Sequence, residues 1–167
     1  MANWKETSAT AWAGLDLKIG TPGSNNAMAT SLATIGNIED MSSETEEGEK
    51  KEWKDINGKI VDSYQQENTL KWTVKVKNLN KSTLEKFWDV EEDTSNGSLK
   101  VKGTSTSKKF SIQIVNSVQN AEVFSAPYCS VSSKLTFEKD KGYGMELTFT
   151  ILEPAKGKEL FVIGQTS

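Results

Sequence analysis

The sequence contains no histidine and no arginine, and Cys129 is its only cysteine. The absence of histidine removes the most common general base and metal ligand, and with it the Ser-His-Asp and Cys-His nucleophile arrangements. A single cysteine excludes an intramolecular disulfide and a thiolate zinc site. All 20 basic residues are lysines, so the side chain preferred for bidentate phosphate or guanine contacts is missing. These absences predict a structural or binding protein rather than an enzyme.

Length and composition predict one folded domain over residues 1–167. Hydrophobic residues make up 35% and charged residues 26% of the chain, which is typical of a soluble folded protein. The net charge of −3 gives no long-range attraction for nucleic acid. No apolar run approaches about 20 residues, so no membrane contact is expected. The first residues lack a signal-peptide pattern, which favours synthesis in the cytosol.

Period-two alternation of apolar residues marks three strands, at residues 70–76, 129–137 and 145–151. Such alternation is typical of sheets with one buried and one wetted face. The row at 129–137 comprises Cys129, Val131, Leu135 and Phe137, and Cys129 is expected in the core. Asp140-Lys-Gly142 predicts a hairpin between the last two strands. Shorter apolar patterns predict further strands at residues 15–19, 32–38, 99–101, 110–114 and 160–163.

One short helix is expected at residues 82–90. Ser82 and Glu85 have the spacing of a capping box, and Leu84, Phe87 and Trp88 share one helical face. The sequence therefore predicts a mainly β fold, with two packed antiparallel sheets in a sandwich or partly open barrel and one short flanking helix.

Residues 39–65 have an unusual charge pattern. Six acidic residues lie between Glu39 and Glu49 without a lysine, and Lys50 and Lys51 then reverse the sign. Asn57-Gly58 predicts a hairpin turn in which both turn positions take positive φ, with arms at residues 51–56 and 59–65. The acidic part of this long charged hairpin in one copy could pair with the lysines of the same hairpin in another copy. Complementary charges of this kind set the register of a contact between subunits.

Other interpretations of the polar residues remain open. The acidic stretch could bind calcium, but it lacks the spacing of a calcium loop, and 93–97 matches only a fragment of that spacing. A solvated charged loop is the plainer interpretation. Paired carboxylates could act on glycosides, yet no two stand out. No cofactor or metal is therefore expected.

A lysine row and three tryptophans also permit two interpretations each. Lys71, Lys75 and Lys77 could contact phosphates, or they could be the wetted face of an edge or surface strand. Trp4, Trp12 and Trp53 lie outside the apolar rows. They could be buried against the body or could act as anchors of a protein interface.

The order of these features resembles the major tail tube proteins of long-tailed phages and the tube proteins of related injection machines. The resemblance covers residues 14–153. It includes the strand Gly14-Leu-Asp-Leu-Lys-Ile-Gly, then Ile35-Gly-Asn-Ile-Glu-Asp-Met-Ser, and the acidic stretch from Ser43 that leads into the Lys-rich hairpin. The strand from Asn68 and the helix complete it.

The resemblance implies a virion protein that assembles into stacked hexameric rings. These rings form a tail tube through which DNA leaves the capsid without specific binding, and the other partners are tail proteins. The hairpin would reach a neighbouring subunit or ring, and an N-terminal arm at residues 1–13 would order on assembly through Trp4 and Trp12. The implied contact residues of the hairpin are Glu44, Glu46, Glu47, Glu49, Lys50, Lys51, Trp53 and Lys54.

Two alternatives remain at this stage. A stand-alone β-sandwich that binds carbohydrate could use Trp53, Trp72 or Trp88 as surface aromatics. A minor tail-completion protein of the same fold is the other. The sequence does not choose which strand would line a lumen.

Overall fold

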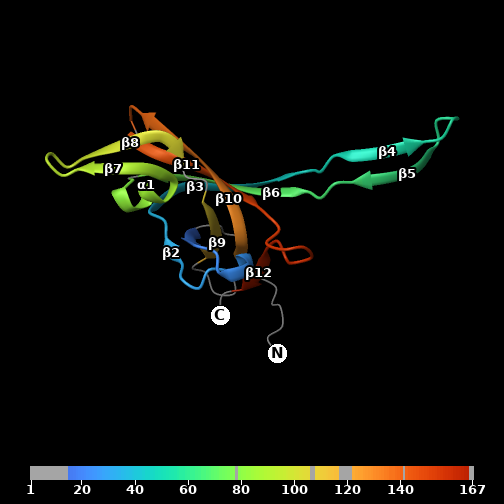
Figure 1. Ribbon diagram of the computed structural model, residues 1–167, viewed down its shortest axis with the longest axis horizontal. Coiled ribbons are helices and arrows are strands. Elements are labelled where there is room, and N and C mark those ends of the chain that lie inside the picture. Colours follow the sequence, from blue (N-terminus) through green and yellow to red (C-terminus); the bar gives the residue numbers. More distant parts are fainter. Residues whose placement is uncertain (1–14, 78, 106–107, 117–121, 141, 166–167) are drawn as a thin grey trace.

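The computed structural model describes residues 15–77, 79–105, 108–116, 122–140 and 142–165 (Figure 1). The expected N-terminal arm, with Trp4 and Trp12, lies outside the described residues. The fold is mainly β with antiparallel sheets and one helix, as predicted. Its elements are β1 (Leu15–Gly20), a 3-10 turn (Ser24–Asn26), β2 (Ala33–Thr34), β3 (Asn37–Glu46), β4 (Lys50–Lys54), β5 (Ile60–Gln65), β6 (Thr69–Lys77), α1 (Lys81–Phe87), β7 (Trp88–Asp93), β8 (Ser98–Ser105), β9 (Lys109–Asn116), β10 (Glu122–Glu138), β11 (Gly142–Ile151) and β12 (Val162–Gln165).

The main sheet folds over on itself because one long strand belongs to both of its layers. The strand order is β2-β1-β9-β10-β11-β6-β3, with β12 also paired to β10. Residues 122–126 of β10 lie beside β9 and β12, residues 129–138 pair with β11, and Cys129 and Ser130 pair with β9 as well. A bulge between Ala126 and Cys129 separates the two parts, and such bulges bend a strand. The first layer is thus β2-β1-β9-β10-β12 and the second is β10-β11-β6-β3.

The core lies between these layers. Most of the side chains in the expected apolar rows are buried in it. Trp72, Val74 and Val76 of β6 are buried. Cys129 is fully buried, as predicted. The remaining buried side chains include Leu17 and Ile19 of β1, Phe110, Ile112 and Ile114 of β9, and Met145, Leu147, Phe149 and Ile151 of β11. Phe87 of α1 packs against Phe110 and Phe149, with ring centroids 5.3 and 6.5 Å apart. The helix therefore closes one end of the sandwich.

The predicted start and end of the helix were both wrong. Asn80, not Ser82, is the N-cap, and its Oδ1 accepts a hydrogen bond from the Thr83 backbone N–H at 2.8 Å. Asparagine is among the best N-cap residues, so it takes the role two positions earlier. The helix ends at Phe87, and Trp88 has extended backbone and begins β7. The helix is nevertheless short and flanking, as the pattern indicated.

Two expected strands differ in the structure. The segment at 32–38 is divided, because Gly36 has a φ of +42° between β2 and β3. The apolar row of β10 is less buried than alternation predicted. Val131 and Leu135 are partly buried, but Phe137 is 78% exposed. The strand runs past the point where the rest of the body covers it.

Candidate self-association surfaces

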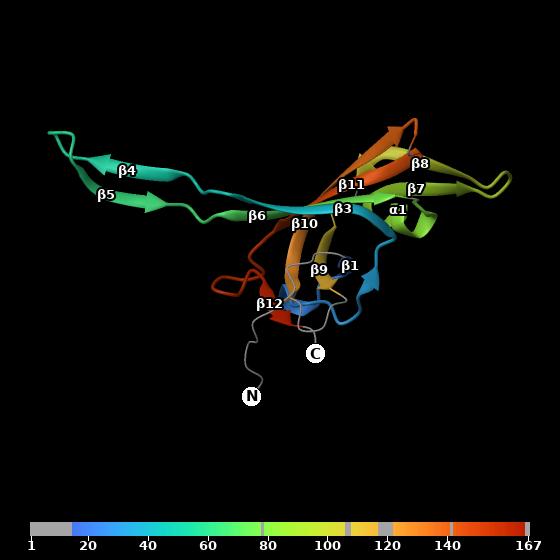
Figure 2. The same ribbon diagram turned by 180° about the vertical axis from the view of Figure 1, so that it is seen from behind.

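The long hairpin at residues 39–65 forms an arm that projects far beyond the body (Figures 1 and 2). Its root is the pair of β3 and β6, which belongs to the main sheet. Its outer part is the two-stranded ribbon of β4 and β5, and every residue of both strands is exposed. From Glu46 to Asp55 the chain spans about 30 Å at roughly 3.3 Å per residue. We call β4, β5 and their turn the ribbon.

The turn at the tip follows different chemistry from the predicted one. Gly58 has a φ of +79°, but Asn57 is not among the described residues with positive φ. The Gly58 N–H donates to the Asp55 carbonyl at 3.0 Å, and the Asp55 carboxylate accepts from the N–H groups of Asn57 and Lys59. One glycine in the left-handed region and one aspartate are therefore enough to close the ribbon.

The ribbon carries large apolar side chains that nothing in the described part of the chain covers. Trp53 is 51% exposed and Ile56 is fully exposed at the tip. Ile60, Val61 and Tyr64 of β5 are also exposed. Directly opposite residues of antiparallel strands share a face. The register pairs Lys51 with Tyr64 and Trp53 with Asp62, so the two aromatics lie on one face with one lysine and one aspartate.

The sequence-predicted contact residues fall on three parts of this arm. Glu44 and Glu46 lie on β3, Glu47 and Glu49 lie at the joint between β3 and β4, and Lys50, Lys51, Trp53 and Lys54 lie on β4. Two of them have partners within the same chain. Glu46 pairs with Lys71 of β6, and Lys50 pairs with Glu52 at 3.0 Å.

The joint depends on Gly48. Its N–H donates to Asn68 Oδ1 at 3.0 Å. A Cβ at this position would lie 2.0 Å from the Gln66 carbonyl oxygen and 2.7 Å from that of Glu67. Real Cβ atoms do not come so close to backbone atoms. Only glycine therefore allows the two sides of the hairpin to approach each other this closely. Sequence reasoning missed this position because the approach is across the hairpin.

The second layer presents two unpaired strand edges. β3 pairs only with β6 among the described residues. On the opposite side of this layer, the last β10 residue paired with β9 is Ser130, so residues 131–138 have a partner strand on one side only within the part of the chain that the structure describes. Open edges of this length are surfaces for pairing with another chain.

The outer face of this layer is polar and organised in rows. The cross-strand register aligns Lys134, Glu146, Lys75 and Asp40 in one row of alternating charge, and Ser132, Thr148, Thr73 and Ser42 in the next row. β6 is thus an inner strand, so its lysine row lies on the wetted face of a surface strand and not on an edge strand, the other position expected for it. Lys77 pairs with Glu39 at 2.9 Å. Acids on neighbouring strands therefore offset the lysines.

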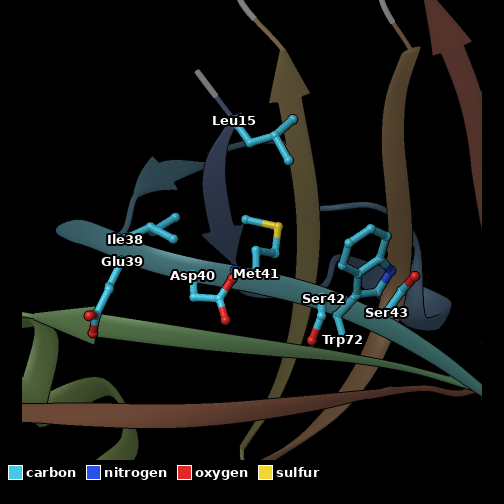
Figure 3. A pocket seen from close by; sticks show the side chains of 8 residues that line it. All are labelled: Leu15, Ile38, Glu39, Asp40, Met41, Ser42, Ser43 and Trp72. Carbon is cyan, nitrogen blue, oxygen red and sulfur yellow. Dashed lines mark hydrogen bonds between the residues drawn. The ribbon is translucent and has the colours of Figure 1, made fainter. Parts of the chain in front are cut away.

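A groove of about 550 Å³ lies between the edge of β3 and the start of β1 (Figure 3). Leu15, Ile38, Met41 and Trp72 form its apolar lining. Figure 3 shows Ile38 and Met41 reaching from β3 toward Leu15, with the Asp40 carboxylate turned to the other side. This is the place where the two layers of the sandwich diverge.

A second exposed aromatic group lies at the end of the hairpin of β10 and β11. Phe137 and Tyr143 are direct cross-strand partners, and Tyr143 is 55% exposed. The Tyr143 hydroxyl donates to the Leu79 carbonyl at 3.4 Å. The predicted hairpin is present here, although residue 141 lies outside the described residues. Alternation correctly gave the face of Phe137 but not its exposure.

The geometry does not support the possible calcium sites at residues 39–49 and 93–97. Residues 39–46 form a strand, so their side chains alternate between two faces. Within the described residues, no group of three or more acidic, cysteine or histidine side chains could hold a metal ion. Asp93 instead organises the turn of β7 and β8, accepting from the Ser95 N–H and hydroxyl.

The tryptophans of a possible sugar-binding surface lie in different environments. Trp72 is buried, and its Nε1 has no hydrogen-bond partner among the described residues. Trp88 is half-buried, and its Nε1 donates to Ser133. Only Trp53 of the three is exposed on the surface.

Two comparisons with known proteins gave no relatives. No protein-family model matches this chain, and no curated protein matches it. In the described part of the chain, no helix has the length and apolarity to cross a membrane.

Proposed function

We propose that this protein is a structural subunit that assembles with copies of itself into stacked rings, forming the tail tube of a long-tailed phage. The observation that carries the proposal is the ribbon. An isolated two-stranded ribbon is at best marginally stable in water. This one exposes Trp53, Tyr64 and three aliphatic side chains, and a neighbouring subunit that covers them would supply the missing burial.

Ring formation is supported by the two open edges of the second layer. This layer has four antiparallel strands, so its first and last strands run in opposite directions. A rotation about an axis roughly parallel to the strands brings β10 of one copy beside β3 of the next in antiparallel orientation. Repetition of such a head-to-tail contact closes a ring. The resemblance to tail tube proteins implies six copies in that ring.

The polar outer face of the second layer suits a lumen through which DNA passes. Each lysine on this face has an acidic residue on an adjacent strand, and arginine is absent from the chain. Binding to DNA depends on clusters of unopposed positive charge that release counterions. Alternating charges and hydroxyl rows would let phosphates pass without holding them.

The test is assembly of the purified full-length protein over a range of concentrations. We expect rings and tubes in negative-stain micrographs and a concentration-dependent increase in sedimentation coefficient. The double variant Trp53→Ser, Tyr64→Ser should keep the thermal unfolding midpoint, because both side chains are exposed, and should lose tubes. Leu99→Ser, an exposed apolar side chain on β8, is the matched control.

The outcomes separate the possibilities. Rings that never stack would indicate a tail-completion protein of this fold. A wild-type protein that stays monomeric at every concentration would contradict the proposed function. Tubes formed equally well by the double variant would show that the ribbon is not a contact surface.

A further inference from the structure

The alternating row on the second layer ends in opposite charges at its two open edges. Lys134 stands at the β10 end and Asp40 at the β3 end, with Glu146 and Lys75 between them. Both end residues are exposed. Inside the row each charge has an opposite charge on the next strand, whereas each end residue has such a neighbour on one side only. The row is therefore incomplete in a single copy.

We infer that the β3 edge of one copy pairs with the β10 edge of a second copy in one register, with Asp40 beside Lys134 of the second copy. This inference rests on the proposed function and specifies its ring contact. The charged row then continues across the boundary as lysine, acid, lysine, acid. The adjoining hydroxyl row continues as well, because Ser42 comes beside Ser132 of the second copy.

In the same register, Leu135 and Phe137 of the second copy fill the groove beside β3. Side chains of β10 alternate, so Leu135 and Phe137 lie on the face opposite Lys134. With Lys134 of the second copy beside Asp40, its Leu135 and Phe137 lie on the side of β3 from which Ile38 and Met41 extend. Figure 3 shows that these two side chains point into the groove, away from Asp40. The aromatic ring that is 78% exposed in one copy thus meets the apolar side of the groove in the next, which Leu15, Ile38 and Met41 line.

The two copies are complementary in charge on the outer face of this contact and in apolar character on its inner face. On the outer face, a cation meets an anion. On the inner face, apolar side chains meet the lining of Leu15, Ile38 and Met41. A shift of one residue would put Lys134 over the apolar part of the groove lining and Leu135 in water, because it exchanges the two faces of the strand. A shift of two residues keeps the faces but separates Lys134 from Asp40 and breaks the charged row. The faces and the charges together therefore select the register.

Thiol crosslinking between copies tests the register directly. The double variant Ser42→Cys, Ser132→Cys, treated with a short bifunctional thiol reagent after assembly, should give a ladder of covalent multimers. Either single variant should give none. Within one copy the two positions lie at opposite edges of four strands, about 14 Å apart at roughly 4.8 Å per strand, so they cannot link internally. The pair Ser42→Cys, Ser130→Cys, which is two residues out of register, is the matched control.

Charge exchange gives an independent measurement. Asp40→Lys and Lys134→Asp should each raise the concentration needed for assembly by roughly tenfold, and the double exchange should restore it. Asp89→Lys makes the same change in charge on β7 and should have little effect. Phe137→Ser should weaken assembly without lowering the unfolding midpoint.

The results distinguish this inference from the proposed function. Normal tubes without a covalent ladder, or a ladder only from the control pair, would overturn the register and leave the tube proposal standing. Failure of the wild-type protein to assemble would overturn both. Two impaired single charge variants whose combination is not rescued would also contradict the pairing of Asp40 with Lys134.

Discussion

The indole Nε1 of Trp88 donates a hydrogen bond to Ser133 Oγ at 2.6 Å, which joins the start of β7 to β10. Ser133→Ala would leave this half-buried donor without its partner. Such a loss costs about 1 to 3 kcal/mol, so we expect the thermal unfolding midpoint to fall by roughly 2 to 4 °C for each kcal/mol. Ser132→Ala on the exposed outer face is the control and should change little. Equal midpoints for the two variants would show that the bond contributes nothing.

Gly48→Ala should change the arm and spare the body. The new Cβ would lie 2.0 Å from the Gln66 carbonyl oxygen, so the backbone of the joint must move and re-aim the ribbon. We expect little change in the unfolding midpoint and a clear loss of tubes in micrographs. Gly103→Ala is the matched control, because a Cβ there meets nothing within 4 Å. Tubes of normal yield from Gly48→Ala would mean that the direction of the ribbon is unimportant.

Reversal of charge at the root of the arm should impair assembly without unfolding the subunit. Glu44, Glu47 and Glu49 are exposed, and Glu46 should be kept because it pairs with Lys71. The triple change to lysine shifts the net charge of residues 39–65 from −5 to +1, and we expect a smaller sedimenting fraction at a fixed concentration. High salt should partly rescue the variant if the effect is electrostatic. Unchanged assembly would exclude these acids from the contact.

Asp93 should contribute to the dependence of stability on acid pH. Its hydrogen bond from the Ser95 hydroxyl, followed by Lys100 at 3.0 Å, lowers the pKa of this carboxyl below its ordinary value. A lowered pKa in the folded state stabilises the protein above the ordinary pKa, and the contribution disappears as the pH falls through the folded value. The difference in unfolding midpoint between the wild type and Asp93→Asn should therefore shrink from pH 6 toward about pH 2. A difference that does not vary with pH would contradict this role.

Cys129 should be inert in the folded protein. Burial raises the pKa of its thiol to about 12, so the reactive thiolate is scarce at neutral pH. Iodoacetamide should label it only after unfolding, as read by intact mass. The raised pKa also means that the contribution of this thiol to stability is constant below about pH 8.5 and declines above it, because the unfolded chain ionises first. Rapid labelling of native protein would show that the core opens locally at β10.

The parts of the fold that sequence could predict are those set by neighbours along the chain. Alternation in β6 and β11 predicted which side chains face inward, and Asn57-Gly58 predicted the position of the turn, although Asp55 rather than a positive φ at Asn57 completes it. The exposure of Phe137 depends on how far the opposite layer of the sandwich extends. Alternation along one strand does not predict the length of another layer. The cap of α1 was missed because Asn80 and Ser82 are both capable caps. The two open edges, the groove and the crossing at Gly48 all arise from strands distant in sequence.

Residues 47–49 interrupt the strand pairing between the ribbon and the body. A protease can therefore cut the ribbon while the body stays folded. Every trypsin site in this chain is a lysine, and Lys51, Lys54 and Lys59 lie exposed on a ribbon that no other described strand covers. Brief digestion of free subunits should therefore clip this segment first and leave a resistant trunk. In a finished polymer the same bonds would be shielded by a neighbour, so the rate of clipping would report how much of a sample has polymerised.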